Sequence, residues 1–248
     1  MSGVALITGS GRGIGAATAK LAARRGYSVC VNYLKNEARA DEVVAAIRSG
    51  GGRAIMVQAD TANEDEVQKL FERVDLELGP ITALVNNAGI TGRACRLDAF
   101  DAGAIRRVLD VNVVGAILCS QQAVKRMSTK NGGAGGAIVN VSSRAAELGG
   151  AGQWIPYAAA KGAINSFTIG LAKEVAAEGI RVNAVSPGLI STEIHAEAGL
   201  VDRLQTAPAM IPMGRIGTAE ECAEAILWLM SNEAAYMIGS ILTLSGGR

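Results

Sequence analysis

The chain has 248 residues, of which 24 are basic and 23 acidic, and 49% of its residues are apolar. This composition excludes a disordered protein, and the scattered, nearly balanced charges argue against a nucleic-acid binder. Glycine is in excess: 31 of the 248 residues, or 12.5%, are glycine, whereas about 7% is usual. The glycines do not recur at the three-residue period of a collagen.

Short runs rich in β-branched residues alternate along the chain with longer segments of helical spacing. Seven runs are predicted as buried strands: Val4–Thr8, Ser28–Tyr33, Ala54–Val57, Thr82–Asn86, Ala137–Val141, Arg181–Val185 and Ile241–Leu244. About six helices are expected between them, the first over Ala16–Arg25. This alternation predicts an α/β fold, a doubly wound seven-stranded parallel sheet with helices on both faces.

Two of the expected helices carry start signals. Asn63 precedes Glu66 by three residues, and Thr218 precedes Glu221 by three, which is the spacing of a capping box. These pairs predict helices that begin directly after Asn63 and Thr218.

Two glycine clusters are interpreted as connections. Gly50–Gly52 is expected to end a helix with a positive φ, and Gly132–Gly136 is expected to be a flexible surface connection. No Pro- or Ser-rich linker divides the chain, so we predict a single domain over residues 1–248.

Membrane and secretory segments are not expected. Long uncharged stretches such as Gly79–Gly92 and Val111–Val124 cover 14 residues each, whereas a membrane helix needs about 20. The first residues lack the basic start of a secretory signal. Four cysteines without Cys-x-x-Cys spacing indicate free thiols in a reducing compartment, so we expect a cytoplasmic protein.

Residues 8–15 read Thr-Gly-Ser-Gly-Arg-Gly-Ile-Gly, directly between the first strand and the first helix. A glycine turn in this place directs backbone N–H groups and the positive end of the helix dipole at an anion. The spacing departs from G-x-G-x-x-G because position 14 is isoleucine. We interpret the turn as a dinucleotide phosphate cradle, and the tight turn of an ordinary strand–helix unit is the alternative.

Three motifs together resemble the short-chain dehydrogenase/reductase family: this turn, Asn86-Asn87-Ala88-Gly89, and Tyr157-Ala-Ala-Ala-Lys161. The resemblance covers essentially the whole chain. It is strongest to the single-domain branch that includes 3-oxoacyl-carrier-protein reductases and glucose 1-dehydrogenases. The resemblance implies a Rossmann-type NAD(P)-binding catalytic domain, with a substrate lid at about residues 190–213.

The resemblance implies four catalytic residues. Residues i and i+4 lie one above the other on a helix, so Lys161 would hold its ammonium near the Tyr157 hydroxyl and lower the pKa of that hydroxyl. Ser143 is selected as the hydroxyl that polarises a substrate carbonyl, and Ser142 remains open as a structural hydroxyl. Asn112 matches the asparagine that supports the lysine through a water, with a helix-internal backbone contact as its alternative.

The end of the second strand bears on the choice of cofactor. It reads Val31-Asn32-Tyr33, with Lys35 close behind and no acid before Glu37. An acid there usually binds the ribose 2′-hydroxyl of NAD, whereas Arg12 and Lys35 would pair with a 2′-phosphate. We therefore favour NADP (NADPH) and keep NAD as possible.

The resemblance also places residues along the cofactor. Asp60, Asn86 and Ala88 would border the adenine and its ribose, and Pro187, Gly188 and Thr192 would border the nicotinamide. The full set of predicted cofactor-binding residues is Gly9, Gly11, Arg12, Gly13, Ile14, Gly15, Asn32, Tyr33, Asp60, Asn86, Ala88, Gly89, Tyr157, Lys161, Pro187, Gly188 and Thr192.

The expected reaction is hydride transfer between a nicotinamide and the carbonyl or alcohol carbon of a small molecule. Positional candidates for the substrate pocket are Glu147, Gln153, Trp154 and Leu189. No metal is expected, because the single His195 and the scattered cysteines give no ligand cluster.

Small residues around the Tyr–Lys helix permit close packing, and by resemblance we expect a homotetramer or homodimer. The alternative function is a non-catalytic NADP-binding sensor, which would not require Tyr157. A nucleotide-linked methyltransferase is disfavoured by the Tyr–Lys pair.

Overall fold

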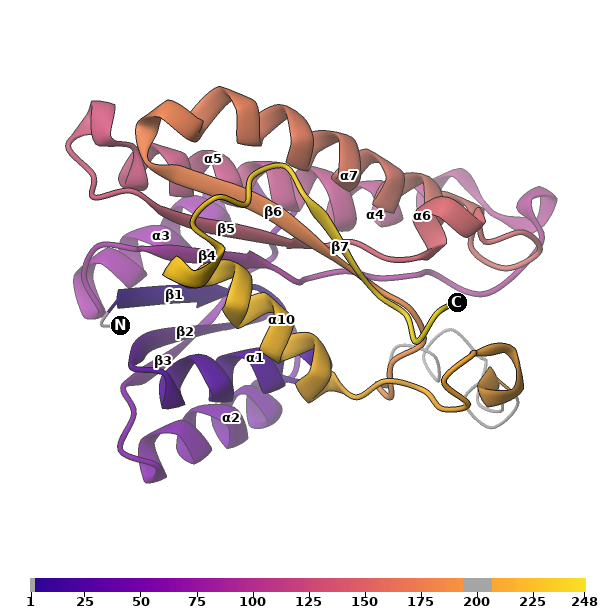
Figure 1. The fold of residues 1–248 in the computed structure, drawn as a ribbon, viewed down its shortest axis with the longest axis horizontal. Helices are drawn as coiled ribbons and strands as arrows, with labels where there is room; N and C mark the ends of the chain where they lie inside the picture. The colour runs from indigo at the N-terminus through magenta and orange to yellow at the C-terminus, as the bar shows by residue number, and fades with distance from the viewer. Residues whose placement is uncertain (1–2, 194–206) are drawn as a thin grey trace.

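The sheet of the computed structural model has seven parallel strands in the order β3-β2-β1-β4-β5-β6-β7, and residues 3–193 and 207–248 are described (Figure 1). Every predicted strand is found, within two residues of its expected ends. The strand order reverses between β1 and β4, and such sheets bind ligands at the carboxyl ends of the strands around that point. The strands are β1 (Gly3–Ile7), β2 (Tyr27–Tyr33), β3 (Ala54–Gln58), β4 (Ala83–Asn86), β5 (Gly136–Val141), β6 (Ile180–Pro187) and β7 (Ile241–Leu244).

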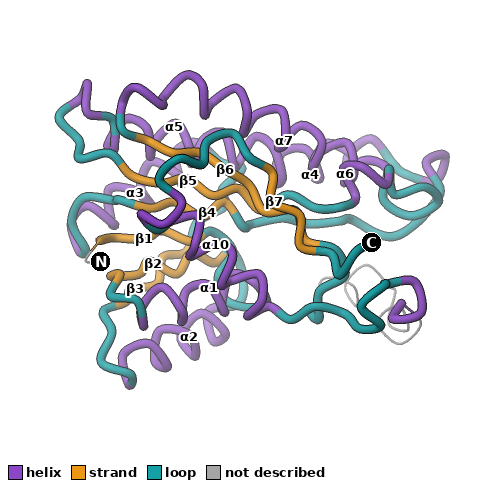
Figure 2. Tube along the Cα trace, viewed as in Figure 1, coloured by secondary structure: helices purple, strands orange, loops and turns teal. Residues whose placement is uncertain are grey.

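Helices cover both faces of the sheet, which confirms the predicted doubly wound fold (Figure 2). On one face lie α1 (Gly13–Arg24), α2 (Glu37–Ser49) and α10 (Ala219–Met230). On the other lie α3 (Glu64–Glu77), α5 (Gly115–Met127) and α7 (Ile155–Val175). Two shorter helices, α4 (Ala102–Leu109) and α6 (Ala145–Leu148), flank the cavity described below.

The other helical segments of the described residues are single turns. A π-helical turn, Asp110–Val114, joins α4 to α5, and 3-10 turns occur at Leu97–Ala99, Thr129–Asn131, Ala176–Glu178, Ala207–Met210 and Asn232–Ala234. In the described ranges no helix is long and apolar enough to cross a membrane.

The core is split into two layers by the sheet, and β1 illustrates why its strands read as continuous apolar runs. Successive side chains of a strand point to opposite faces. Ala5 and Ile7 therefore pack under α1, α2 and α10, while Val4 and Leu6 pack under α3, α5 and α7. Because both faces are covered, every position of the strand has to be apolar.

The two helix-start signals have different outcomes. At α10, Thr218 and Glu221 form the complete reciprocal capping box that their spacing predicts. At α3, Asn63 does accept the Glu66 N–H at 3.2 Å, but the Glu66 carboxylate receives the Asp60 N–H at 2.7 Å instead of closing the box. The α3 cap therefore also holds the loop that follows β3.

Gly132–Gly136 is not the flexible connection expected from its composition. A Cβ at Gly133 would lie 2.3 Å from the Arg126 carbonyl oxygen, and one at Gly135 would lie 2.5 Å from the Gly179 carbonyl oxygen. The segment is also bonded, since the Gly135 N–H donates to the Met127 carbonyl at 2.8 Å. Close backbone packing, and not freedom of movement, explains Gly133 and Gly135. At the other cluster, Gly51 carries the positive φ that ends α2.

Two alanine substitutions separate these effects. Gly132 and Gly135 have similar φ values of +85° and +77°, but a Cβ at Gly132 meets nothing within 4 Å. We expect Gly132→Ala to lower the free energy of unfolding by about 1 kcal/mol and Gly135→Ala by about 2–4 kcal/mol, because only the latter adds a clash to the backbone strain. Urea denaturation at one protein concentration measures both. Equal losses would contradict the close packing.

Candidate active site

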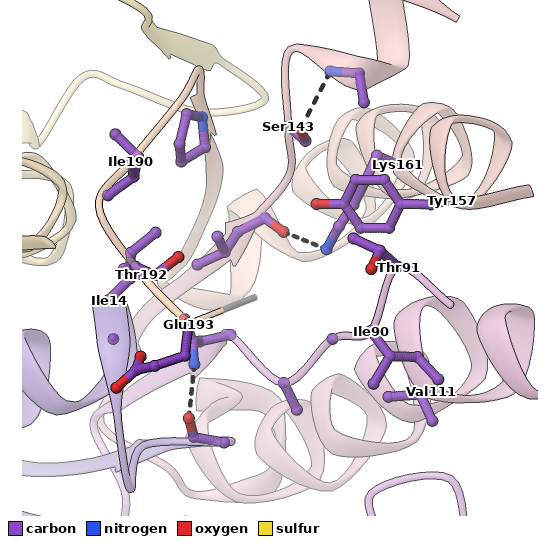
Figure 3. A pocket seen from close by; sticks show the side chains of 18 of the residues that line it. Ile14, Ile90, Thr91, Val111, Ser143, Tyr157, Lys161, Ile190, Thr192 and Glu193 are labelled. Atoms are coloured by element: carbon purple, nitrogen blue, oxygen red, sulfur yellow. Dashed lines mark hydrogen bonds between the residues drawn. The ribbon is translucent and has the colours of Figure 1, made fainter. Parts of the chain in front are cut away.

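A continuous cavity of about 1420 Å³ runs along the carboxyl ends of the strands (Figure 3). Its lining comes from the loops after β1, β2, β3, β4, β5 and β6, and from the start of α7. Sixteen of the predicted catalytic and cofactor-binding residues line it: Gly9, Gly11, Arg12, Gly13, Ile14, Asn32, Tyr33, Asp60, Ala88, Gly89, Ser143, Tyr157, Lys161, Pro187, Gly188 and Thr192.

The glycines of the first turn are needed by the fold itself. Gly9 and Gly13 have φ values of +61° and +53°. A Cβ at Gly9 would lie 2.9 Å from Ala88 Cα, and one at Gly15 would lie 2.5 Å from Asn87 Nδ2. Gly15 does not line the cavity. The missing side chain of Gly15 allows the glycine turn to pack against the loop after β4. This packing requires a glycine at position 15 whether or not a phosphate binds nearby.

Hydrogen bonds join these two loops. Asn87 Nδ2 donates to the carbonyls of Thr8 and Gly9 at 2.8 and 3.0 Å. Thr8 Oγ1 accepts the N–H groups of Asn87 and Ala88, both at 3.0 Å. The turn after β1 and the loop after β4 therefore form one bonded floor for the cavity.

The N-terminus of α1 has the features of an anion site. Its N-cap position is Arg12, which makes no side-chain capping bond, and its first turn contains no acid. The helices α2, α3, α4 and α10 are each capped by an Asn, Asp or Thr side chain, whereas α7, like α1, has no side-chain cap. What distinguishes α1 is that Gly13 and Ile14 of its first turn line the cavity, where an anion could accept from their N–H groups. One oxygen of the Glu193 carboxylate lies 4.0 Å from a Cβ built at Gly13, so a bound anion would lie near this acid.

Basic and polar side chains gather where β2 ends. Lys35, Asn36 and Arg39 line the cavity beside Tyr33, and Arg39 lies next to the glycine turn, with its Cβ 3.8 Å from a Cβ built at Gly11. Sequence reasoning missed Arg39. The signal available for it was a basic residue in the first turn of a helix that starts directly after β2.

Asn32 has a role that the sequence did not predict. It is buried, its Oδ1 accepts the Gly9 N–H at 3.1 Å, and its Nδ2 donates to the Ala59 carbonyl at 3.1 Å. Asn32 therefore ties the glycine turn to the loop after β3 while it lines the cavity.

Tyr157 and Lys161 lie on the first turns of α7, which begins at Ile155 and has Pro156 in its first turn. Lys161 Nζ lies 5.5 Å from the centre of the Tyr157 ring and donates to the Val141 carbonyl at 2.8 Å. Lys161 is only 4% exposed, and its burial lowers the pKa of its ammonium to about 8. Figure 3 shows both side chains together with Ser143.

The pKa of Tyr157 differs from the sequence-based expectation. Burial raises the pKa of its hydroxyl above the ordinary value of 10.0, and the hydrogen bond with Ser143 offsets only part of this effect. The Tyr–Lys spacing predicts a lowered pKa, but in the chain alone desolvation of the phenolate is the larger effect.

The two serines after β5 are distinguished by their partners. Ser142 Oγ donates to Asn165 Oδ1 at 2.5 Å and is 2% exposed, so it fastens β5 to α7. Ser143 Oγ accepts the Ala145 N–H at 3.1 Å and interacts with the Tyr157 hydroxyl. Ser142 is thus the structural hydroxyl, and Ser143 is the one placed beside the tyrosine.

Asn112 lies behind the cavity, in the π-helical turn. Its Nδ2 donates to the carbonyls of Ile90 and Val108 at 2.7 and 2.8 Å, while its buried Oδ1 has no hydrogen-bond partner in the described structure. A Cβ built at Gly89 would lie 2.6 Å from that Oδ1 and 3.5 Å from Lys161 Nζ. Both readings of Asn112 thus keep support: it bonds backbone, and it retains an acceptor on the lysine side.

Two of the predicted cofactor-binding residues, Gly15 and Asn86, lie outside the cavity lining. Asn86 does not line the cavity: its Nδ2 donates to Ser120 Oγ at 2.9 Å and to Asn140 Oδ1 at 2.8 Å, inside the core. Its neighbour Asn87 lines the cavity instead.

The substrate candidates divide in the same way. Gln153, Trp154 and Leu189 line the cavity, whereas Glu147 pairs with Arg144 and does not. Of the expected lid at residues 190–213, Ile190, Thr192, Glu193 and Met210 line the cavity. Residues 194–206, including His195, lie outside the described part. In the described ranges no group of three His, Cys, Asp or Glu side chains could hold a metal ion.

Comparison with known proteins agrees with this geometry. A family described as enoyl-(acyl carrier protein) reductase matches residues 9–248. The chain is 51% identical over 245 residues to the uncharacterized oxidoreductase YgfF of Escherichia coli, covering 99% of both chains. It is 42% identical over 245 residues to cis-4-hydroxycyclohexanecarboxylate dehydrogenase of Sinomonas cyclohexanicum, covering 98% of this chain and 95% of that protein.

Among solved structures, a short-chain dehydrogenase of Burkholderia cenocepacia in complex with NADP superposes with a TM-score of 0.88 at 36% identity, covering 98% and 96% of the two chains. A short-chain type dehydrogenase/reductase of Mycobacterium marinum superposes with a TM-score of 0.92 at 33% identity, covering 99% and 94%. The chain belongs to the short-chain dehydrogenase/reductase family and is an NAD(P)-dependent oxidoreductase acting on hydroxyl or carbonyl groups. The non-catalytic sensor is not supported.

Proposed function

We propose that the protein interconverts a small-molecule ketone and its secondary alcohol with NADP(H), within a single catalytic domain spanning residues 1–248. One observation carries the proposal: Ser143, Tyr157 and Lys161 meet in the same cavity as the N-terminus of α1, which has no side-chain cap. The first group can act on an oxygen atom, and the second can hold a diphosphate. A single sheet with one core layer on each face supports one domain.

Each residue has a distinct task in this proposal. Ser143 donates a hydrogen bond to the substrate oxygen, and Tyr157 gives that oxygen its proton in reduction or removes it in oxidation. Lys161 holds positive charge beside the tyrosine and favours the phenolate that remains when the proton has left. The bound nicotinamide supplies or accepts the hydride. Trp154 and Leu189 line the cavity with apolar surface, which suits the carbon skeleton of a substrate.

NADP is favoured over NAD by the charge around the end of β2. Arg12, Lys35 and Arg39 line the cavity there. Arg39 forms an ion pair with Glu42 at 3.4 Å, and both side chains are exposed. Such a pair contributes little, so the guanidinium is available for a doubly charged 2′-phosphate.

Arg39→Met tests this preference. We expect the KM for NADPH to rise about 10- to 100-fold, because a hydrogen bond between charged groups contributes about 1.5–3 kcal/mol. The KM for NADH should change less than twofold, since NADH lacks the 2′-phosphate, and it serves as the internal control. Initial rates at 340 nm with both cofactors measure this, and an equal rise for both would contradict the assignment.

The substrate class is supported by relatives of known name. One is cis-4-hydroxycyclohexanecarboxylate dehydrogenase, and another, a 3-oxoacyl-[acyl-carrier-protein] reductase of Synechocystis, is 40% identical over 247 residues. A panel of cyclic ketones, 3-oxoacyl thioesters and the matching alcohols, assayed with NADPH and NADP, tests the function. Absence of turnover across all three groups, with bound NADPH detected, would contradict it.

We further propose a cytoplasmic homotetramer, with a homodimer as the smaller alternative. Support for assembly comes from α7, whose exposed side carries Ala159, Ile169 and Gly170, and from the exposed Val114 and Ile117 at the start of α5. Support for a reducing compartment comes from four free cysteines, three of them buried. Sedimentation of the purified protein tests assembly, and a sedimenting monomer would contradict it.

A further inference from the structure

Arg107 and Asp60 form an ion pair at one end of the cavity. Arg107 Nη2 lies 2.9 Å from Asp60 Oδ2, and the pair joins the last turn of α4 to the loop after β3. Both residues line the cavity. Because β3 is the outermost strand on one side of the sheet and β5 lies beyond β4, this end is remote from Ser143, which follows β5.

The proposed function, on which this inference rests, determines what reaches this end. The diphosphate lies at the N-terminus of α1, after β1, and the nicotinamide lies toward Tyr157. The adenosine half must then extend past the end of β2 toward β3. With Arg39 facing its ribose phosphate, the space beside Asp60 is left for the base.

The side chains around Asp60 form a slot of the right chemistry. Val111 follows Arg107 by four residues, and both line the cavity from the same helical segment. Val111 is 8% exposed and gives the slot an apolar wall, whereas the Arg107 side chain is 43% exposed and lies toward the outside. Residues four apart lie side by side on one helix face, so an apolar side chain and a planar cation are presented together to a purine ring beside Asp60.

The Asp60 carboxylate can still accept hydrogen bonds from the edge of an adenine base. Its Oδ1 accepts the Ala62 N–H at 3.0 Å, and its Oδ2 accepts from Arg107. A carboxylate offers about four acceptor positions, so about two remain for an amino group. The ion pair with Arg107 therefore orients the Asp60 carboxylate and leaves acceptor positions for a ligand.

We propose that Arg107 is an adenine-binding residue, whose guanidinium is held in place by Asp60 and stacks on the purine ring next to Val111. Guanidinium groups stack on nucleic-acid bases in the same manner, and stacking on a side chain contributes about 1–3 kcal/mol per base. In the opposing interpretation, the ion pair only fastens α4 to the sheet and does not touch the cofactor.

The test uses adenosine 2′,5′-bisphosphate, which carries the adenine half of NADP and requires no catalysis. Arg107→Met keeps the apolar stem and removes the planar cation, and Arg107→Lys keeps the charge and removes the plane. Arg106→Met is the matched control, because Arg106 is the adjacent residue of α4, is exposed and does not line the cavity. We expect calorimetric titration to give a Kd about tenfold higher for both Arg107 variants and unchanged for Arg106→Met.

A second readout separates binding from a loss of structure. Reduced nicotinamide mononucleotide lacks the adenosine half, so the ratio of kcat/KM with NADPH to kcat/KM with this truncated cofactor should fall about tenfold in Arg107→Met. An unchanged ratio, or fragment binding by Arg107→Lys equal to that of the unaltered protein, would overturn the stacking assignment while NADPH-dependent turnover still supports the proposed function. If the unaltered protein neither binds the bisphosphate nor oxidises NADPH, the proposed function itself fails.

Discussion

Replacing Tyr157 by phenylalanine is expected to lower kcat by about 10²- to 10⁴-fold while the Kd for NADPH stays within twofold. The substitution removes one oxygen atom, and with it the group that exchanges a proton with the substrate oxygen. Burial raises the pKa of the Tyr157 hydroxyl, so near neutral pH the hydroxyl is protonated and ready to donate in the reducing direction. Steady-state rates with a ketone substrate, together with fluorescence titration of NADPH, measure the two quantities.

The control for this substitution is Tyr236→Phe, at a tyrosine whose side chain is fully exposed. It should leave kcat unchanged. If Tyr157→Phe retained more than about a tenth of the turnover, a different proton donor would have to be found in the cavity. If NADPH binding were lost as well, the phenylalanine would have disturbed the cavity. In that case Ser143→Ala becomes the test, and it should lower kcat while NADPH still binds.

Replacing Lys161 by methionine is expected to change both turnover and the pH dependence of folding. The ammonium is buried, and its pKa in the folded chain is lowered from 10.5 to about 8. The unfolded chain therefore holds more protons than the folded chain between about pH 8 and pH 10.5, and the stability of the unaltered protein rises with pH across that window. Below about pH 8, the cost of burying the charged lysine is fully present.

Methionine does not titrate, so this rise is absent in the variant. The difference in unfolding free energy between the unaltered protein and Lys161→Met should shift by about 2–3 kcal/mol in favour of the unaltered protein from about pH 7 to about pH 10. The size of the shift does not depend on the lost hydrogen bond to the Val141 carbonyl, which adds the same constant at every pH. Urea denaturation across this range measures it, and kcat should fall by at least about 10²-fold.

Lys173→Met is the matched control, because Lys173 lies on the same helix and is exposed. Its substitution should leave both kcat and the pH dependence of unfolding unchanged. A constant difference between the unaltered protein and Lys161→Met over the whole range would show that Lys161 is not buried as a cation in the folded chain.

Strands and helix faces were predictable because the physical rule behind them is local. A strand covered on both sides has to be apolar at every position, so β1 and β5 could be located within a residue or so from composition alone. The end of β6 was placed two residues early. It extends to Pro187 because Ser186 and Pro187 pair with Thr243 and Leu244 of β7, a contact between segments far apart in the sequence.

The motif residues of the site were predictable from the sequence, but the other residues that surround them in the cavity were not. The spacing of Tyr157 and Lys161 on one helix follows from helix geometry, but the pKa of Tyr157 depends on how much of the chain surrounds it. Arg39 and Arg107 lie on different helices, and only the folded sheet brings both to one cavity. The side chains of the neighbouring residues Asn86 and Asn87 point to the core and to the cavity, and the residue at which β4 ends decides which is which.

The bonded floor beneath the cavity has a thermodynamic consequence. Because Thr8, Gly9, Asn87 and Ala88 already hold one another across the switch point, an incoming dinucleotide does not have to bring the loops after β1 and β4 into register. The entropy lost on binding then comes mainly from the ligand and from side chains at the rim, such as Arg39. Substitutions at the edge of the cavity, such as at Arg39, should therefore change the affinity for the cofactor while the bonded loops after β1 and β4 stay unchanged.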